Sequence, residues 1–368
     1  MSVLILAKDE QRCIARCLDS VVGHGFGVIV ADTGSTDGTL GIVAGYRDHG
    51  VRVVPTPWSG SFADARNAAL ESVVDGWVLC LDADEWLAEG AAADLVSCLV
   101  SLRDKDCSQV VLAPVIRDVD HGSYRDDIPR ILRVDGPVRY RGQVHEYLVV
   151  RGAVDTPPER VAVDVEIRHD GYNPAVFAAK RKRDRNMSLV AQARASDPDN
   201  PRWLYFALRD GFPSLSADQV ADLCETMRGL TGIEPRTGDR QSAAEYYRYA
   251  LSLACQGMAG RGNWSLVERF CAELERLRPG GDPDARYFRL VFELLHGVPT
   301  TRDLLGTIRL RKDDTLVSTS GLDPAGGHLD ALIAALLERL RGSAVAEQYR
   351  AMSVPWTDGF FKESRPRW

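Results

Sequence analysis

The sequence has no apolar run approaching the roughly 20 residues that a membrane-spanning helix requires. Its first apolar run is short and is followed directly by Lys8, Asp9 and Glu10, without the charged leader and cleavage site of a secretion signal. We therefore expect a soluble, cytoplasmic protein. An excess of positive charge is also missing, because the net charge is −7. General binding of nucleic acid is not expected from such a chain.

Several common site signatures are absent as well. None of the eight cysteines forms a CxxC pair, and in a reducing compartment we expect free, mostly buried thiols. Cys13 and Cys17 would share a helix face, but no nearby pair of His or Cys completes a tetrahedral metal site. There is no GxxxxGKS loop, and the glycines of GHGFG at residue 23 precede a strand instead of joining a strand to a helix. A P-loop phosphotransferase and a dinucleotide fingerprint are not supported.

The composition that is present, 45% hydrophobic and 26% charged over 368 residues, suits a globular protein of two or three domains. Up to about Asn173, short β-rich runs alternate with helical patterns, which predicts parallel strands with crossover helices. We expect strands at residues 3–7, 27–32, 51–54 and 77–81, and helices at 10–22, 37–46 and 61–74. Ser61 and Asp64 predict a capping box at the start of the third helix.

Shorter strand-like runs follow at 128–134, 146–150 and 161–167, and they predict an antiparallel or mixed extension of the same sheet. Beyond Pro174 helical patterns take over, for example at 243–258, 264–277, 285–295 and 329–340. The pairing of these helices suggests a tetratricopeptide-like stack, although no strict period repeats. We expect a first domain at 1–173, a helical domain at 174–352 and a tail at 353–368 that is either free or docked.

Three carboxylates follow the apolar run WVLCL at residue 77. Asp82 and Asp84 therefore lie where a buried strand ends, and ligands of open α/β sheets bind beyond the carboxyl ends of the strands. Two aspartates in this position suit a hard divalent cation that bridges to substrate phosphates. The alternative is a polar turn before a helix near Gly90.

A second polar cluster, DTGSTDGT at residue 32, follows the second strand. Asp32 can accept hydrogen bonds from a nucleobase or ribose, and the small residues allow close backbone approach. Ser35 and Asp37 are individually well explained as turn and N-cap residues. That explanation does not account for acids at the ends of both strands.

Four segments together resemble the family 2 glycosyltransferases in order and spacing, namely SVLILAKDE at 2, DTGSTDGT at 32, ARN at 65 and DADE at 82. VHE at 144 and IRHDGY at 167 are similar to the branch that includes lipopolysaccharide-core glucosyltransferases and glycocin peptide S-glycosyltransferases, which often append a helical, tetratricopeptide-like domain. The resemblance implies an α/β fold with a GT-A type, Rossmann-like mixed sheet and flanking helices, followed by an all-α domain.

The same resemblance implies roles for the donor-side residues. Asp32 would bind the base, Asp82 would lie by the ribose, and Arg66 would help to hold the nucleotide, since its guanidinium suits phosphate or a neighbouring carboxylate. Ala7 and Lys8 would line the nucleotide pocket.

Metal and acceptor residues follow from the resemblance in the same way. Asp84 would ligate Mg²⁺ or Mn²⁺ on the diphosphate, and His169 would be a further ligand, which favours manganese. For the base that deprotonates the acceptor, Glu146 is the candidate, His145 is the second choice, and an edge-strand role is the alternative. Weaker candidates for the base are Asp126 and Asp127.

These residues together predict a metal-dependent, inverting glycosyltransferase that uses a nucleotide sugar, a UDP-sugar for preference. The acceptor would be a peptide, a saccharide or a natural product, and the helical domain would shape the acceptor site or a homodimer interface. A sugar nucleotidyltransferase is disfavoured because the first strand is not followed by a glycine-rich loop. A non-catalytic peptide-binding scaffold is the other alternative. The basic run KRKRDR at 180 would bind phosphate or an anionic acceptor, or form a solvated helix face.

Overall fold

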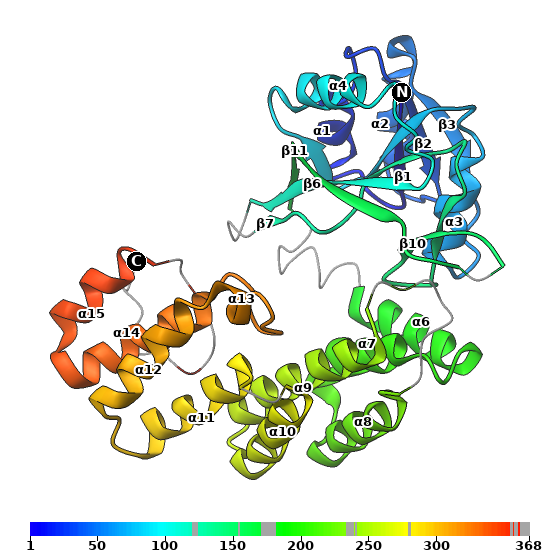
Figure 1. The fold of residues 1–368 in the computed structure, drawn as a ribbon. Helices are drawn as coiled ribbons and strands as arrows, with labels where there is room; N and C mark the ends of the chain where they lie inside the picture. Colours follow the sequence, from blue (N-terminus) through cyan, green and yellow to red (C-terminus); the bar gives the residue numbers. More distant parts are fainter. Residues whose placement is uncertain are drawn as a thin grey trace. The chain divides into compact units, whose positions relative to one another are not determined.

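The computed structural model describes residues 1–119, 124–153, 155–170, 182–232, 239, 241–278, 281–353, 356 and 360. The chain divides into two compact units with the main boundary between Pro198 and Asp199; of the described residues beyond it, Asp239 is grouped with the first unit. The first unit is a sheet with flanking helices and the second is helical (Figure 1). The prediction of an α/β fold with a mixed sheet, followed by an all-α region, is confirmed.

The sheet of the first unit has the strand order β3-β2-β1-β4-β8-β6-β11-β5. Its first four strands are parallel and match the predicted ones closely: β1 (Ser2–Ala7), β2 (Gly27–Asp32), β3 (Arg52–Pro55) and β4 (Trp77–Asp82). The other half mixes directions and contains β5 (Glu85–Leu87), β6 (Val110–Asp118), β7 (Tyr124–Arg125), β8 (Ile131–Arg133) and β11 (Glu159–His169). A separate antiparallel pair is formed by β9 (Val138–Arg141) and β10 (Tyr147–Val150).

Alternate side chains of the central strands enter two different cores, as the twofold period of a strand requires. Val3 and Ile5 of β1 pack in one core with the helices on that side, whereas Leu4 packs in the other. The first core is covered by α1 (Ile14–Asp19), α2 (Thr39–Ala44) and α4 (Ala91–Ser101). The second is covered by α3 (Phe62–Leu70) and the β9–β10 pair. Helix α6 (Lys182–Ser196) also lies in the first unit.

The second unit is built from consecutive helices around one apolar core (Figure 1). Serine and threonine N-caps start several of them, and Ser216, Ser242 and Thr300 form complete capping boxes. The helices are α7 (Pro201–Gly211), α8 (Ala217–Leu230), α9 (Ala243–Gly260), α10 (Trp264–Leu277), α11 (Pro283–His296), α12 (Thr301–Arg311), α13 (Asp314–Val317), α14 (Gly327–Arg341) and α15 (Ser343–Arg350).

Of the tail predicted at 353–368, the structure describes Ser353 and two aromatic residues. Phe360 packs against the core of the helical unit, and the Trp356 ring lies 5.9 Å from that of His328. These contacts favour the docked alternative for the tail. Among the helices within the described ranges, none combines the length and apolar character needed to cross a membrane.

Candidate active site

Strand register brings three predicted site residues to one edge of the sheet. Ala7 at the end of β1 pairs with Asp32 at the end of β2, and Leu6 of β1 pairs with Asp82 at the end of β4. Ala7 is buried, whereas the side chain of Lys8, which follows the strand, is exposed. The hydrophobic strands thus deliver two acids to the place where ligands bind open α/β sheets.

The loops after β1 and β2 are cross-linked at this edge. The carboxylate of Asp32 accepts hydrogen bonds from the backbone N–H groups of Gly34 (3.1 Å) and Ser35 (3.2 Å). Asp9, whose φ of +53° lies in the left-handed region, accepts a bond from the Thr36 N–H at 2.7 Å, and its own N–H donates to the Ser35 hydroxyl at 3.0 Å. These short side-chain bonds hold the two loops together, so the surroundings of Asp32 are preorganised.

A line of five charged side chains, which we call the ionic network, crosses the end of β4. Arg66 of α3 donates from Nη2 to Asp82 Oδ1 (2.5 Å) and from Nε to Glu146 Oε1 (2.8 Å). Arg130 donates to Asp82 Oδ2 (2.9 Å) and to Glu85 Oε1 (2.6 Å). The second oxygen of Glu85 accepts the backbone N–H of Asp82 at 3.0 Å. The network therefore joins α3, β4, β5, the segment before β8 and the segment before β10.

Burial and charge act in opposite directions on the acids of this network. Partial burial favours the neutral form of Asp82, but the guanidinium groups of Arg66 and Arg130 outweigh it and hold its pKa well below the usual range. For Glu85, which is 2% exposed, burial dominates over the attraction of Arg130 and raises the pKa. Asp82 is thus a fixed anion at the sheet edge, and it keeps 37% of its side chain exposed to solvent.

The predicted metal ligands also come together. Oδ1 of Asp84 lies 3.8 Å from Nε2 of His169, the last residue of β11. On the other side of the ring, Oδ2 of Asp118 lies 3.8 Å from Nδ1. Two atoms that each lie about 2.1 Å from one divalent cation are separated by roughly 3 to 4 Å, so the first spacing fits a shared cation. A carboxylate behind a metal-binding imidazole is a common arrangement, and Asp118 is placed for it.

Protein atoms alone do not complete a metal site at this position. Within the described residues, no group of three or more His, Cys, Asp and Glu side chains is arranged to hold a metal ion. Divalent cations in phosphate-transfer sites are often held by one or two protein ligands, with substrate phosphates and water filling the rest. Asp84 and His169 fit that kind of shared site.

The acceptor-side candidates precede β10. The backbone of His145 has a φ of +50°. This left-handed conformation is unfavourable in free energy for most residues other than glycine, and it lies directly before Glu146. The side chain of Glu146 is 15% exposed and its Oε1 is bonded to Arg66. The weaker alternatives lie elsewhere: Asp127 is paired with Arg125, and Asp126 is exposed. Glu146 is therefore the candidate base that is joined to the donor-side residues.

Sequence reasoning did not single out Arg130 or Glu85 as members of the site. Glu85 stands in the DADE motif, so its position at a strand end could have suggested it. The sequence around Arg130 does not indicate a role in the site, because its partners Asp82 and Glu85 lie 48 and 45 residues away in the sequence. Arg66 was expected to bind either phosphate or a neighbouring carboxylate. In the structure its guanidinium donates hydrogen bonds to two carboxylates.

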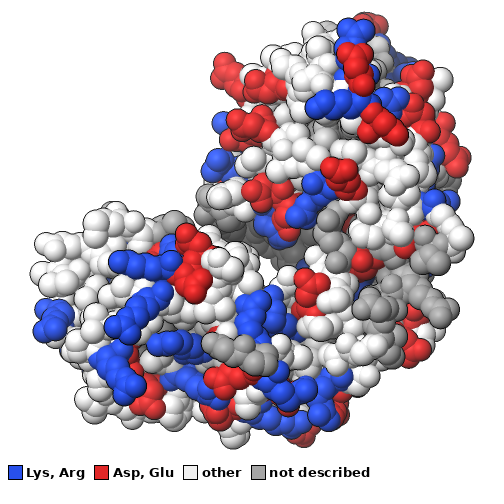
Figure 2. Space-filling view, viewed as in Figure 1, with Lys and Arg blue, Asp and Glu red and all other residues white. Residues whose placement is uncertain are grey.

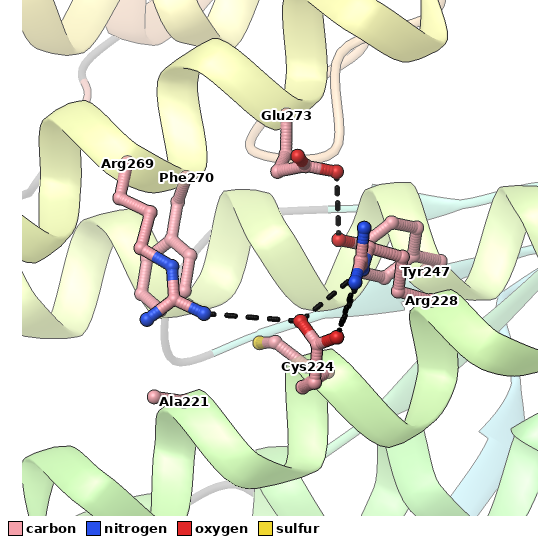
Figure 3. A pocket seen from close by; sticks show the side chains of 8 residues that line it. Ala221, Cys224, Arg228, Tyr247, Arg269, Phe270 and Glu273 are labelled. Atoms are coloured by element: carbon pink, nitrogen blue, oxygen red, sulfur yellow. Dashed lines mark hydrogen bonds and ion pairs between the residues drawn. The ribbon is translucent and has the colours of Figure 1, made fainter.

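The helical unit contains a separate cavity of about 190 Å³ between α8, α9 and α10 (Figure 3). Arg228 and Arg269 both pair with Glu225, and the Tyr247 hydroxyl donates to Glu273 at 3.2 Å. The charges at this cavity thus neutralise each other, and none of the predicted site residues lines it. On the face shown in Figure 2, Lys and Arg side chains predominate over the helical unit, with fewer acidic side chains among them.

Comparison with known proteins supports the motif resemblance. Residues 2–145 match the family model described as Glycosyl transferase family 2. The SPbeta prophage-derived glycosyltransferase SunS of Bacillus subtilis is 30% identical over 209 residues, which are 56% of this chain and 48% of SunS. A TPR repeat-containing protein of Synechococcus elongatus is 25% identical over 291 residues, which are 72% of this chain and 69% of that protein.

A third relative is the lipopolysaccharide core biosynthesis glycosyltransferase LpsC of Rhizobium meliloti, 32% identical over 107 residues, which are 28% of this chain and 38% of LpsC. Among solved structures, the crystal structure of S. aureus TarS aligns with 78% of this chain and 52% of that chain, at 16% identity and a TM-score of 0.37. This chain spans about half the length of SunS. The family 2 match covers residues 2–145, which contain the four motifs up to DADE, and over this part the chain is similar to glycosyl transferase family 2.

Proposed function

We propose that the chain is a metal-dependent, inverting glycosyltransferase that moves a sugar from a nucleotide diphosphate, a UDP-sugar for preference, to a nucleophilic acceptor. The observation that carries the proposal is the convergence at one sheet edge of Ala7, Asp32 and Asp82 in strand register, with Asp84 and His169 placed 3.8 Å apart. The match of residues 2–145 to the family model supports the same activity. The chain would bind its donor with the first unit.

On the donor side, Asp32 would accept hydrogen bonds from the base with a carboxylate already oriented by two backbone N–H groups. Asp82 would contact the ribose through its exposed part while Arg66 and Arg130 hold it in place. Because Arg66 is bonded to both Asp82 and Glu146, we assign it the positioning of these acids as its main contribution.

Asp84 and His169 would hold Mg²⁺ or Mn²⁺, with a preference for manganese because imidazole suits it better. When bound, the ion supplies charge stabilisation for the leaving diphosphate. Glu146 would take the proton of the acceptor on the face of the sugar opposite the leaving group, with His145 as the second candidate. Inversion at the sugar carbon follows from such a single displacement.

Acceptor chemistry is open to a peptide, a saccharide or a natural product. SunS and LpsC are both glycosyltransferases, and LpsC is described as acting in lipopolysaccharide core biosynthesis. We propose that the helical unit, which would be tetratricopeptide-like, shapes the acceptor site or a dimer interface. The domain division at about residue 173 and the cytoplasmic location remain predictions.

The test is a panel of nucleotide sugars incubated with the full chain and Mn²⁺, with hydrolysis of the donor followed by mass spectrometry. We expect one donor, a UDP-sugar, to be hydrolysed. Asp84→Asn should slow this hydrolysis by about 100-fold or more, because charge stabilisation by a metal contributes several kcal/mol. The matched control is Asp104→Asn, since Asp104 is 93% exposed and lies after α4, away from the site.

Three results would contradict the proposal. Equal turnover in the Asp84 variant and in the control would remove the metal role. Absence of both hydrolysis and nucleotide binding across the whole panel would favour the peptide-binding scaffold, whereas pyrophosphate-dependent formation of nucleotide sugar would favour the nucleotidyltransferase.

A further inference from the structure

Helix α6 carries an arginine to the region of the ionic network. The guanidinium carbon of Arg185 lies 5.0 Å from the centre of the Phe62 ring, within range of a cation–π contact. Trp58 packs edge-on against Phe62, with ring centres 4.8 Å apart. Phe62 begins α3, and Arg66 follows four residues later on the same face of that helix. Arg185 therefore contacts the helix that carries Arg66, at a residue one turn before it.

The charge of Arg185 is not neutralised by a carboxylate in the part of the chain that the structure describes. Glu146 and Glu10 are the acids whose charge acts on it, but neither forms an ion pair with it there. Its hydrogen bonds in the described residues go to Oδ1 of the adjacent Asn186, at 3.2 and 3.4 Å. A guanidinium has five N–H donors, so Arg185 retains donors for a ligand.

Four other arginines among the described residues of this region already bind carboxylates. Arg66 and Arg130 bind the carboxylates of the network, and Arg12 and Arg16 both bind Asp170. Surrounding protein atoms lower the pKa of Arg185 because they limit hydration of its charge, although the side chain as a whole stays exposed. A cation that is incompletely hydrated and lacks an anionic neighbour gains from binding an anion.

We infer that Arg185 binds the diphosphate of the nucleotide donor, an assignment that rests on the proposed function. A diphosphate is multiply negative, and it would enter a region that already holds the acids Asp82, Asp84 and Glu146. Binding of the diphosphate therefore requires cations that are not paired with protein carboxylates, and Arg185 is such a cation among the described residues. The cation–π contact with Phe62 restrains the guanidinium, and the N–H donors that do not bind Asn186 are left for phosphate oxygens.

The test is calorimetric titration of the full chain with UDP and with uridine, both in the presence of Mn²⁺. We expect Arg185→Ala to weaken UDP binding by about 10- to 100-fold, as expected for loss of charge-assisted hydrogen bonds, and to leave uridine binding unchanged. Arg185→Lys should give an intermediate loss, because it keeps the charge and loses the planar fork.

Arg194→Ala is the matched control. Arg194 is exposed on the same helix, and nine residues of α-helix turn it about 180° away from Arg185. We expect this control to bind UDP as the unmodified chain does, and the thermal unfolding of all variants to coincide.

Three outcomes would overturn the assignment. An equal loss for UDP and uridine would place Arg185 at the nucleoside or in the fold alone. Unchanged UDP binding with slower sugar transfer would place it on the acceptor side. If the unmodified chain binds neither UDP nor uridine, the proposed function itself fails and the assignment fails with it.

Discussion

A double-mutant cycle across Arg66 and Asp82 measures whether the ionic network acts as an energetic unit. Arg66→Met leaves Asp82 with Arg130 alone and removes the bond from Arg66 to Glu146. Because the Arg66 side chain is 4% exposed and its partners are partly shielded, its loss should cost about 3–5 kcal/mol in the free energy of unfolding. Asp82→Asn removes one charge from the network and should cost about 1–3 kcal/mol.

The two substitutions should not be additive, because each removes the same ion pair. A charge-assisted hydrogen bond contributes about 1.5–3 kcal/mol, and solvent around the 37% exposed Asp82 screens part of it. We therefore expect a coupling free energy of about 1–2 kcal/mol between Arg66 and Asp82.

Urea unfolding of the four full-length chains, compared at a common m-value, gives this coupling. A parallel cycle with Arg228→Met and Glu225→Gln serves as the control, since both side chains are about half exposed and exposed pairs contribute under about 1 kcal/mol. A coupling for Arg66 and Asp82 no larger than that of the control pair would refute the account of the network.

Three further predictions concern the scaffold of the site and the helical unit. Ser61→Ala removes the side chain that accepts the Asp64 N–H at the start of α3, and it should lower stability by about 1 kcal/mol, seen as a Tm decrease of about 2–4 °C; an unchanged Tm would contradict it. Because His145 has a positive φ, we expect the Tm of His145→Gly to equal or exceed that of the unmodified chain, and the Tm of His145→Val to be lower than both. The reverse order would refute the claim that the backbone is strained at this position. Burial raises the pKa of Cys224 to about 12, so iodoacetamide at pH 8 should label it slowly in the native chain and rapidly in urea, as peptide mass spectrometry would show.

The parallel half of the sheet could be predicted from the sequence because three of its strands, β1, β2 and β4, are buried on both faces. Such strands read as continuous apolar runs, and the run before Asp82 ends abruptly at the first acid. The alternation of strands and helices predicts that β1, β2 and β4 are parallel, so their C-terminal ends lie at the same edge of the sheet. Asp32 and Asp82 could be assigned to one edge of the sheet without coordinates for this reason.

The mixed half was harder to predict: β5, β6 and β7 were not expected, and neither was β9 of the separate antiparallel pair. Strand β6 contains Pro114, which cannot donate to a ladder, and the pairing of β6 with β11 shifts register at this point, between Ala162 and Glu166. Strand β5 has three residues and begins inside the acidic motif, so it looks like part of a turn. Local patterns of this kind do not reveal long-range antiparallel pairs.

The expected helix at 10–22 is also shorter in the structure, where α1 covers Ile14–Asp19. The residues before it are held by the loop after β2, since the N–H groups of Glu10 and Gln11 donate to Thr39 and Asp37. Tertiary hydrogen bonds thus replace the first helical turn. Arg130 escaped prediction for a similar reason, because contacts between distant segments define its role. The basic run at 180–185 includes Arg185 and was expected to bind phosphate or an anionic acceptor, but the sequence does not single out this arginine.

Calorimetric titration of the unmodified chain with UDP, with and without Mn²⁺, tests the central claim most directly. We predict that Mn²⁺ tightens UDP binding and that Asp84→Asn abolishes this tightening while leaving metal-free binding intact. Failure of UDP to bind under either condition would contradict a nucleotide-sugar site at this edge of the sheet.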